Sequence, residues 1–141
     1  MKIGIGSDHG GYLLKLEIKT YLSEKGYEIV DVGNGSEESV DYPIFADNLC
    51  QHIIDGHFQC GILICGTGQG MCMAANRHHE IRAALCQEPF SAKLSREHNN
   101  ANVLCLGGRI LGGALAIDIV HTWLQTEFAG GRHLRRISLF S

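Results

Sequence analysis

Short apolar runs alternate along the chain with stretches whose apolar residues recur at helical spacing. The runs predict strands and the spaced stretches predict helices. The predicted strands are residues 2–7, 27–32, 61–65, 82–86 and 102–106. The predicted helices are residues 12–25, a segment that opens at 41–43 and ends at Gly56, then 71–76, 89–97 and 113–125, and part of the tail 130–141.

The order of these elements predicts the fold class. Five strand–helix alternations with short connections indicate an α/β fold with a mostly parallel sheet. We therefore expect a Rossmann-like, doubly wound, five-stranded α/β/α sandwich, with helices on both faces. The 141 residues fit a single domain, 1–141, with no linker or repeat. In such folds ligands bind beyond the carboxyl ends of the strands, which are followed here by residues 7–11, 65–70 and 107–109.

Composition narrows the function classes. A hydrophobic share of 45% and a charged share of 19% are typical of a globular protein, and the net charge of −3 argues against general nucleic-acid binding. No apolar run approaches the ~20 residues that span a bilayer, and no secretory leader is visible at the start. We expect no membrane partner and a cytoplasmic location.

Cysteine and histidine spacing gives no sign of a metal site. The six cysteines include no C-x-x-C pair, and most lie in apolar runs, where a reduced core thiol is expected. The histidine pairs 52/57 and 78/79 do not form a convincing ligand set. We expect neither a metal nor another cofactor.

A glycine-rich turn follows the third predicted strand. Gly66, Gly68 and Gly70 let the backbone bend sharply and aim N–H groups at one point, which suits a phosphate or an oxyanion. A tight connection without a ligand is the alternative. Cys65 sits directly before the turn, where peptide dipoles favour a thiolate. A thiolate there suits either attack on a carbonyl or removal of a neighbouring proton, and the pattern does not choose between them.

Further polar residues follow other elements. Asp8 and His9 follow the first strand and can contact sugar hydroxyls or phosphate, although Asp8 is also a candidate helix N-cap. His98, at a predicted helix end, is either an acid–base group or a cap. Arg109, together with the pair Arg132 and Arg136, offers guanidinium groups for phosphate or a solvated basic face.

The start of the chain also carries part of a dinucleotide-binding pattern. Gly4, Gly6 and Asp31 echo the dinucleotide fingerprint. His9 occupies the third glycine position, however, and Asp8 places negative charge where a pyrophosphate must approach. We therefore expect no dinucleotide.

Taken together, these segments resemble the ribose-5-phosphate isomerase type B family, which also contains galactose-6-phosphate isomerase subunits. Five blocks carry the resemblance, almost from end to end of the chain: GSDHGG, VDYP, GILICGTGQG, CQEPFSAKLSREHNNANVLCLGGR and GGRHLRR. The resemblance implies metal-free interconversion of ribose 5-phosphate and ribulose 5-phosphate through an enediolate, in the non-oxidative pentose phosphate pathway. It also implies a homodimer, or a dimer of dimers, whose sites draw on both subunits.

The resemblance also implies roles for individual residues. Cys65 matches the base that moves the proton between C1 and C2, and His98 matches the group that opens the furanose ring. Thr67 is expected to take part in catalysis. The loop that steadies the enediolate corresponds to Gly66, Thr67, Gly68, Gln69 and Gly70. The other expected substrate contacts are Asp8, His9, Tyr42, Asn99, Arg109, Arg132 and Arg136, of which the last two lie closest to the phosphate.

Two other functions fit the same scaffold, and two features depart from the family pattern. An isomerase of a six-carbon sugar phosphate, such as allose 6-phosphate, and a non-catalytic sugar-phosphate sensor both fit the scaffold. Retention of both Cys65 and His98 disfavours a galactose-6-phosphate isomerase subunit, which works as a mixed pair. The tail beyond Arg136 is short, which is expected to reduce dimer contacts, and Gln69 with residues 71–73 is expected to alter the shape of the pocket.

Overall fold

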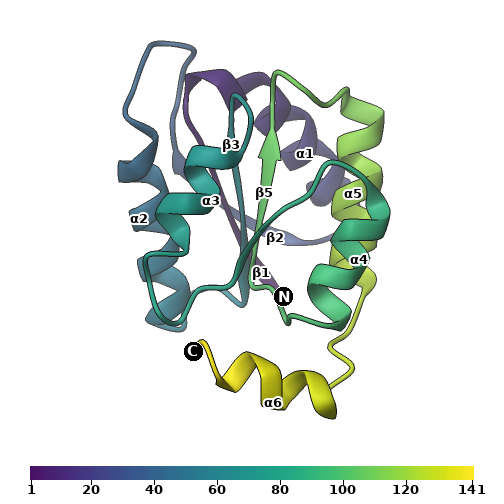
Figure 1. Ribbon diagram of the computed structural model, residues 1–141. Coiled ribbons are helices and arrows are strands. Elements are labelled where there is room, and N and C mark those ends of the chain that lie inside the picture. The colour runs from purple at the N-terminus through teal and green to yellow at the C-terminus, as the bar shows by residue number, and fades with distance from the viewer.

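The computed structural model describes all residues from 1 to 141 and contains one five-stranded parallel sheet (Figure 1). The strands are β1 (Lys2–Ser7), β2 (Glu28–Gly33), β3 (Cys60–Cys65), β4 (Ala83–Leu85) and β5 (Val103–Gly107). Their order in the sheet is β2-β1-β3-β5-β4, and every neighbouring pair is parallel. The predicted mostly parallel sheet is therefore confirmed, and it contains no antiparallel strand.

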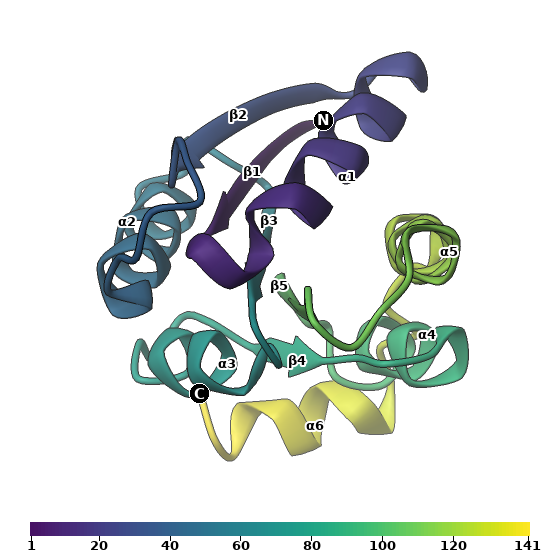
Figure 2. The same cartoon turned by 90° about the horizontal axis from the view of Figure 1, so that it is seen from above.

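Helices cover both faces of the sheet, as predicted. They are α1 (Tyr12–Glu24), α2 (Tyr42–Ile54), α3 (Gln69–Ala75), α4 (Pro89–Glu97), α5 (Gly113–Gln125) and α6 (Arg132–Ser138), with a short 3₁₀ turn η1 (His9–Gly11) before α1. Figure 2 shows α2 and α3 on one face, with α1, α4 and α5 on the other. The last helix, α6, lies across the end of the molecule at which the strands begin (Figure 1).

Successive side chains of β3 point to opposite faces of the sheet, and the core consists of one cluster on each face. Ile62 and Ile64 belong to a cluster of 18 buried residues on the α1 and α5 side. Leu63 and Cys65 belong to a cluster of 10 buried residues on the α2 and α3 side. All six residues of β3 are buried, as expected for a central strand covered on both faces. The side chain of Cys65 therefore points toward α2 and α3.

Several predicted boundaries were wrong by one or two residues. The helix α3 begins at Gln69 rather than at residue 71, because Gly68 turns the chain with a φ of 82° and serves as its N-cap. The strand β4 has three residues rather than five, since this edge strand pairs with β5 only over Ala83–Leu85. Gly26, with a φ of 86°, follows the end of α1 as predicted. None of the helices combines the length and the apolar character that crossing a membrane requires.

Candidate functional site

Three turns meet where the central strands end, at the edge that the sequence predicts. The amide of Gly108 donates to the Cys65 carbonyl at 2.8 Å, and that of Arg109 donates to the Gly66 carbonyl at 2.9 Å. The amide of Asp8 donates to the Ile64 carbonyl at 3.1 Å. These bonds join the segments after β1, β3 and β5 into one surface.

The sulfur of Cys65 faces the glycine turn. The residue is only 5% exposed, and its Sγ accepts a hydrogen bond from the Gly68 amide at 3.2 Å. Only glycine fits at position 68, because an added Cβ would lie 2.6 Å from the Leu85 Cδ1 and 2.9 Å from the Leu106 carbonyl carbon. The geometry thus places a thiol and a set of main-chain donors together.

The same turn carries amides with no partner in the backbone. No backbone carbonyl accepts from the amides of Gly66, Thr67 or Gly70. The amide of Gln69 is occupied, because it donates to the Thr67 Oγ1 at 3.3 Å. The three unpartnered amides can bind an anion or stabilise an oxyanion that develops beside Cys65.

Tyr42 and His9 border this turn. A Cβ added to Gly70 would lie 2.9 Å from the Tyr42 Oη, so the tyrosine ring covers the start of α3. His9 accepts a hydrogen bond at Nδ1 from the Val40 amide at 3.2 Å. Tyr42 therefore lies at the predicted edge, and His9 lies in η1 next to Gly10, whose added Cβ would lie 3.1 Å from the Gly66 nitrogen.

Asp8 is the N-cap of η1, which was the alternative prediction for this residue. Its Oδ1 accepts from the amides of Gly10 at 2.9 Å and Gly11 at 3.2 Å. Both bonds use one oxygen, so Oδ2 remains available to a hydroxyl group. Capping and ligand contact are thus compatible for this carboxylate.

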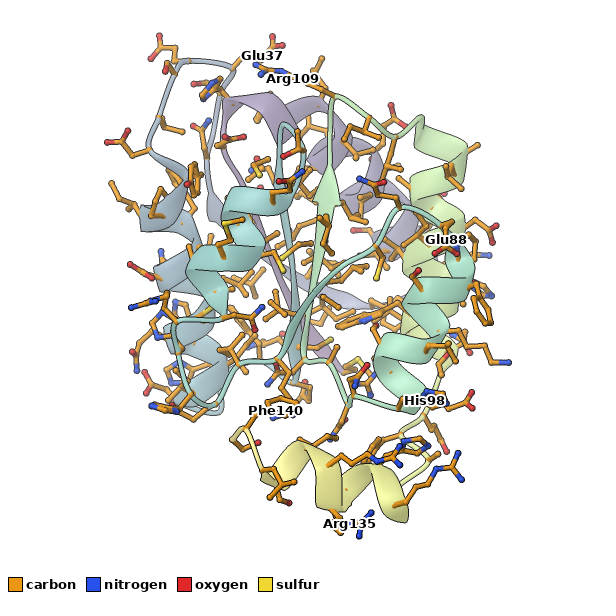
Figure 3. The ribbon with its side chains drawn as sticks, in the orientation of Figure 1. Glu37, Glu88, His98, Arg109, Arg135 and Phe140 are labelled. Carbon is orange, nitrogen blue, oxygen red and sulfur yellow. The ribbon has the colours of Figure 1, made fainter.

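Arg109 supplies positive charge at the same edge. Its Nη1 lies 3.4 Å from the point that a Cβ of Gly66 would occupy. A cavity of about 350 Å³ opens beside it, lined by His9, Gly10, Leu13, Leu14, Glu37, Gly108 and Arg109. Figure 3 shows Arg109 and Glu37 together at the top of the molecule. This cavity is large enough for part of a small phosphorylated sugar.

The other predicted residues lie at the opposite end of the chain's fold. His98 follows α4, and its ring stacks on His133 with centroids 4.3 Å apart. Arg132 and Arg136 lie on α6, and Figure 3 shows His98 and Arg135 at the lower end, far from Arg109. A single chain therefore does not bring His98, Asn99, Arg132 and Arg136 to Cys65.

Positive charge is concentrated at this second end. Desolvation, followed by the charges of His98, Arg132 and Arg136, lowers the pKa of His133, although Glu97 opposes the shift. A cavity of about 540 Å³ also lies at this end, and Asn99, Arg82 and Phe140 are among its lining residues. Neither this cavity nor the smaller one beside Arg109 is lined by Cys65 or by residues 66–70 of the glycine turn.

Sequence reasoning missed two features of the Cys65 edge. Glu37 and Leu13 line the cavity, but an acidic loop residue and an apolar helix residue carry no distinguishing pattern. The hydrogen bond from the Val40 amide to His9 could not be predicted either, because every residue except proline has a backbone N–H whatever its side chain.

These features define an α/β protein of the Rossmann-like type, in which a buried thiol and main-chain donors lie together where the central strands end. Comparison with known proteins agrees with that class. The family model described as Ribose/Galactose Isomerase matches residues 3–140, and the chain belongs to that family.

Individual relatives are similar over nearly the whole chain. Ribose-5-phosphate isomerase B of Escherichia coli is 48% identical over 136 residues, which cover 96% of this chain and 91% of the relative. A D-erythrulose-4-phosphate isomerase of Pectobacterium atrosepticum is 44% identical over 132 residues, 93% of this chain and 87% of the relative. The structure of Clostridium thermocellum ribose-5-phosphate isomerase B superposes with a TM-score of 0.98 at 53% identity, covering 99% of this chain and 94% of that one.

Proposed function

We propose that this protein is a ribose-5-phosphate isomerase that interconverts ribose 5-phosphate and ribulose 5-phosphate. The observation that carries the proposal is the Cys65 sulfur, held at 3.2 Å from the Gly68 amide beside the unpartnered amides of Gly66, Thr67 and Gly70. Proton removal next to a carbonyl creates an oxyanion, and donors that are already in place stabilise it. The names of the E. coli and C. thermocellum relatives support this substrate.

The reaction is a proton transfer with no net redox change. The Cys65 thiolate removes the proton from C2 of the open-chain aldose, and the C–H electron pair becomes the C1–C2 double bond of an enediolate. The charge that moves onto O1 is stabilised by the turn amides. The Thr67 hydroxyl, which faces the same turn, carries a proton from O2 to O1, and Cys65 returns its proton to C1. The product is the ketose.

The complete site requires two copies of the chain. His98 and Asn99 follow α4, and Arg132 and Arg136 lie on α6, away from the turn after β3 that holds Cys65, so the second copy supplies them. A two-fold homodimer then forms two identical sites. Exposed apolar side chains on and after α6, Leu134 at 57%, Leu139 at 84% and Phe140 at 61%, support such an association despite the short tail.

The residues of the second copy have distinct roles in this proposal. His98 exchanges a proton with the ring oxygen to open the furanose. Arg132 and Arg136 hold the phosphate, together with His9 and Arg109 of the first copy. Asn99 and the free Oδ2 of Asp8 bind sugar hydroxyls. All six cysteines are free thiols, which fits a reaction in the reducing cytoplasm.

Deuterium incorporation tests the activity directly. The protein is incubated with ribose 5-phosphate in heavy water, and the sugar is followed by NMR. We expect ribulose 5-phosphate to form and deuterium to appear at the reacting carbon. Binding of ribose 5-phosphate without any deuterium would contradict the isomerase and favour the non-catalytic sensor.

Substrate size is the second question. The Pectobacterium relative, named for a four-carbon sugar phosphate, favours a test of shorter substrates alongside six-carbon ones. We expect kcat/KM to be highest for ribose 5-phosphate in a parallel assay with allose 6-phosphate and D-erythrulose 4-phosphate. A higher value for either of the other two would reassign the substrate but leave the proton-transfer chemistry intact.

A further inference from the structure

Lys15 carries a charge in the interior of the protein. The side chain, on α1, is 0% exposed, and its ammonium donates to the Asp31 Oδ1 at 2.9 Å and to the backbone carbonyl of Asn34. The Tyr12 ring lies 5.4 Å from the same nitrogen. A buried ammonium costs free energy unless it is paired in this way. The catalytic proposal above gives Lys15 no role.

The contacts of Lys15 hold the start of one loop. This loop, residues 33–40, joins β2 to the segment before α2. The Gly33 amide donates to the Asp31 Oδ1 at 2.9 Å, and the Asn34 amide donates to the Ser7 carbonyl at 2.8 Å. The Lys15 ammonium therefore ties the Asn34 carbonyl to the same carboxylate that orders Gly33.

The end of the same loop reaches the candidate site. The Val40 amide donates to the His9 Nδ1 at 3.2 Å. Because a backbone amide can only donate, Nδ1 is the accepting nitrogen and the ring proton of neutral His9 resides on Nε2. Glu37 of this loop lines the cavity that His9 and Arg109 also line.

We propose that Lys15 is a positioning residue: its buried ammonium anchors the loop 33–40, which in turn fixes the orientation and tautomer of His9. In this arrangement the His9 Nε2–H is presented to the cavity as a donor for the anionic group of the substrate. Lys15 itself touches neither the cavity nor the turn after Cys65. The inference rests on the proposed sugar-phosphate site for its kinetic consequence, but not for its structural one.

Two lysines on one carboxylate provide a matched pair of variants. Lys19 also bonds Asp31, through Oδ2 at 2.9 Å, but it is partly exposed and does not contact the loop. We expect Lys15→Met to raise KM for ribose 5-phosphate by about tenfold or more, because the phosphate contact is misplaced, with a smaller effect on kcat. Lys19→Met is expected to leave KM and kcat as in the wild type.

The tautomer gives a readout that a merely structural role would not move. In a long-range ¹H–¹⁵N NMR spectrum, wild-type His9 is expected to show the Nε2–H tautomer, and Lys15→Met a mixture of both. An unchanged His9 spectrum with an unchanged KM in folded Lys15→Met would overturn the proposal. If Lys15→Met does not fold, the double variant Lys15→Met/Asp31→Asn leaves no unpaired buried charge and decides by the same two measurements.

A proline substitution tests the hydrogen bond from Val40 to His9 separately from the contacts of Lys15. Val40→Pro removes the donated N–H, whereas Ser39→Pro introduces a proline at a neighbouring amide that has no hydrogen-bond partner. We expect only Val40→Pro to show a mixture of both His9 tautomers. Equal spectra for the two variants would contradict the loop's role. Because the NMR result needs no turnover, it stands even where the isomerase assay fails, so the two proposals fail separately.

Discussion

Cys65 differs from the other cysteines in what its sulfur contacts. Burial raises the pKa of Cys50 to about 12, and that of Cys60 and Cys86 to about 11, as expected for thiols of the core. The sulfur of Cys65 instead accepts a backbone amide at the mouth of the glycine turn. Of these four thiols, this one alone accepts a hydrogen bond from a backbone amide, which stabilises negative charge on sulfur.

Replacement of Cys65 separates chemistry from binding. We expect Cys65→Ala to reduce proton exchange by about 10³-fold or more, because the general base is lost. Binding of ribose 5-phosphate, measured by calorimetry, is expected to stay close to that of the wild type. Near-normal turnover in the variant would show that the base is misassigned.

Cys72 is predicted to be the most reactive of the remaining thiols. A hydrogen bond from Cys105 is the main cause that lowers the pKa of half-buried Cys72 to about 7. A lower pKa leaves more thiolate at a given pH, so iodoacetamide labelling of Cys72 should rise as the pH increases through about 7. Peptide mass spectrometry of the Cys65→Ala protein checks this. Labelling of Cys60 as fast as Cys72 at pH 7.5 would contradict it.

Side-chain identity predicted only part of the site. The pattern of Cys65 followed by three glycines was sufficient to locate the turn, because cysteine and closely spaced glycines can be recognised in the sequence itself. Lys15 and Val40 were not predicted. A lysine within an amphipathic helix is normally assigned to solvent, and a backbone donor has no side-chain signature. Their contacts depend on the tertiary position of the loop.

At the level of elements, the turn between β3 and α3 depends on the backbone conformation of Gly68. The φ of 82° and the lack of room for a Cβ both exclude other residues. The residue also donates the bond to Cys65. Gly68 therefore determines both the conformation of the turn and the hydrogen bond to the Cys65 sulfur.

Gly68→Ala tests this dependence. The left-handed conformation and the overlap with Leu85 and Leu106 should lower the free energy of unfolding by about 2 kcal/mol or more. The matched control is Gly35→Ala, whose added methyl group meets no atom within 4 Å, and for which a change of less than about 0.5 kcal/mol is expected. Urea unfolding measures both, and equal stabilities would contradict the account of the turn.

Element types were predictable from periodicity, whereas element ends were less so. The five strands and their helices follow from apolar spacing that the buried sheet requires. The shortness of β4 does not, because Cys86 continues the apolar run and still donates to the Cys105 carbonyl at 3.2 Å, although the paired register with β5 ends at Leu85. The early start of α3 was missed since glycines were read as turn rather than as the first residues of a helix.

At the level of the whole molecule, the direction of α4 explains why His98 lies far from Cys65. A helix that connects parallel strands runs back against them, so its last residues lie where the strands begin. His98, just after α4, therefore lies away from Cys65, and α6 gathers Arg132 and Arg136 at the same end. This separation could be predicted from topology alone, and it is the reason for our proposal that a second chain completes the site.

Subunit mixing measures the central claim most directly. Cys65→Ala and His98→Ala proteins, each inactive, are mixed under conditions that allow subunit exchange. If each site combines Cys65 of one chain with His98 of the other, half of the dimers are mixed and each carries one intact site, so about a quarter of wild-type activity should return. If the two residues serve the same site within one chain, every site carries a substitution and no activity returns, which would contradict the account.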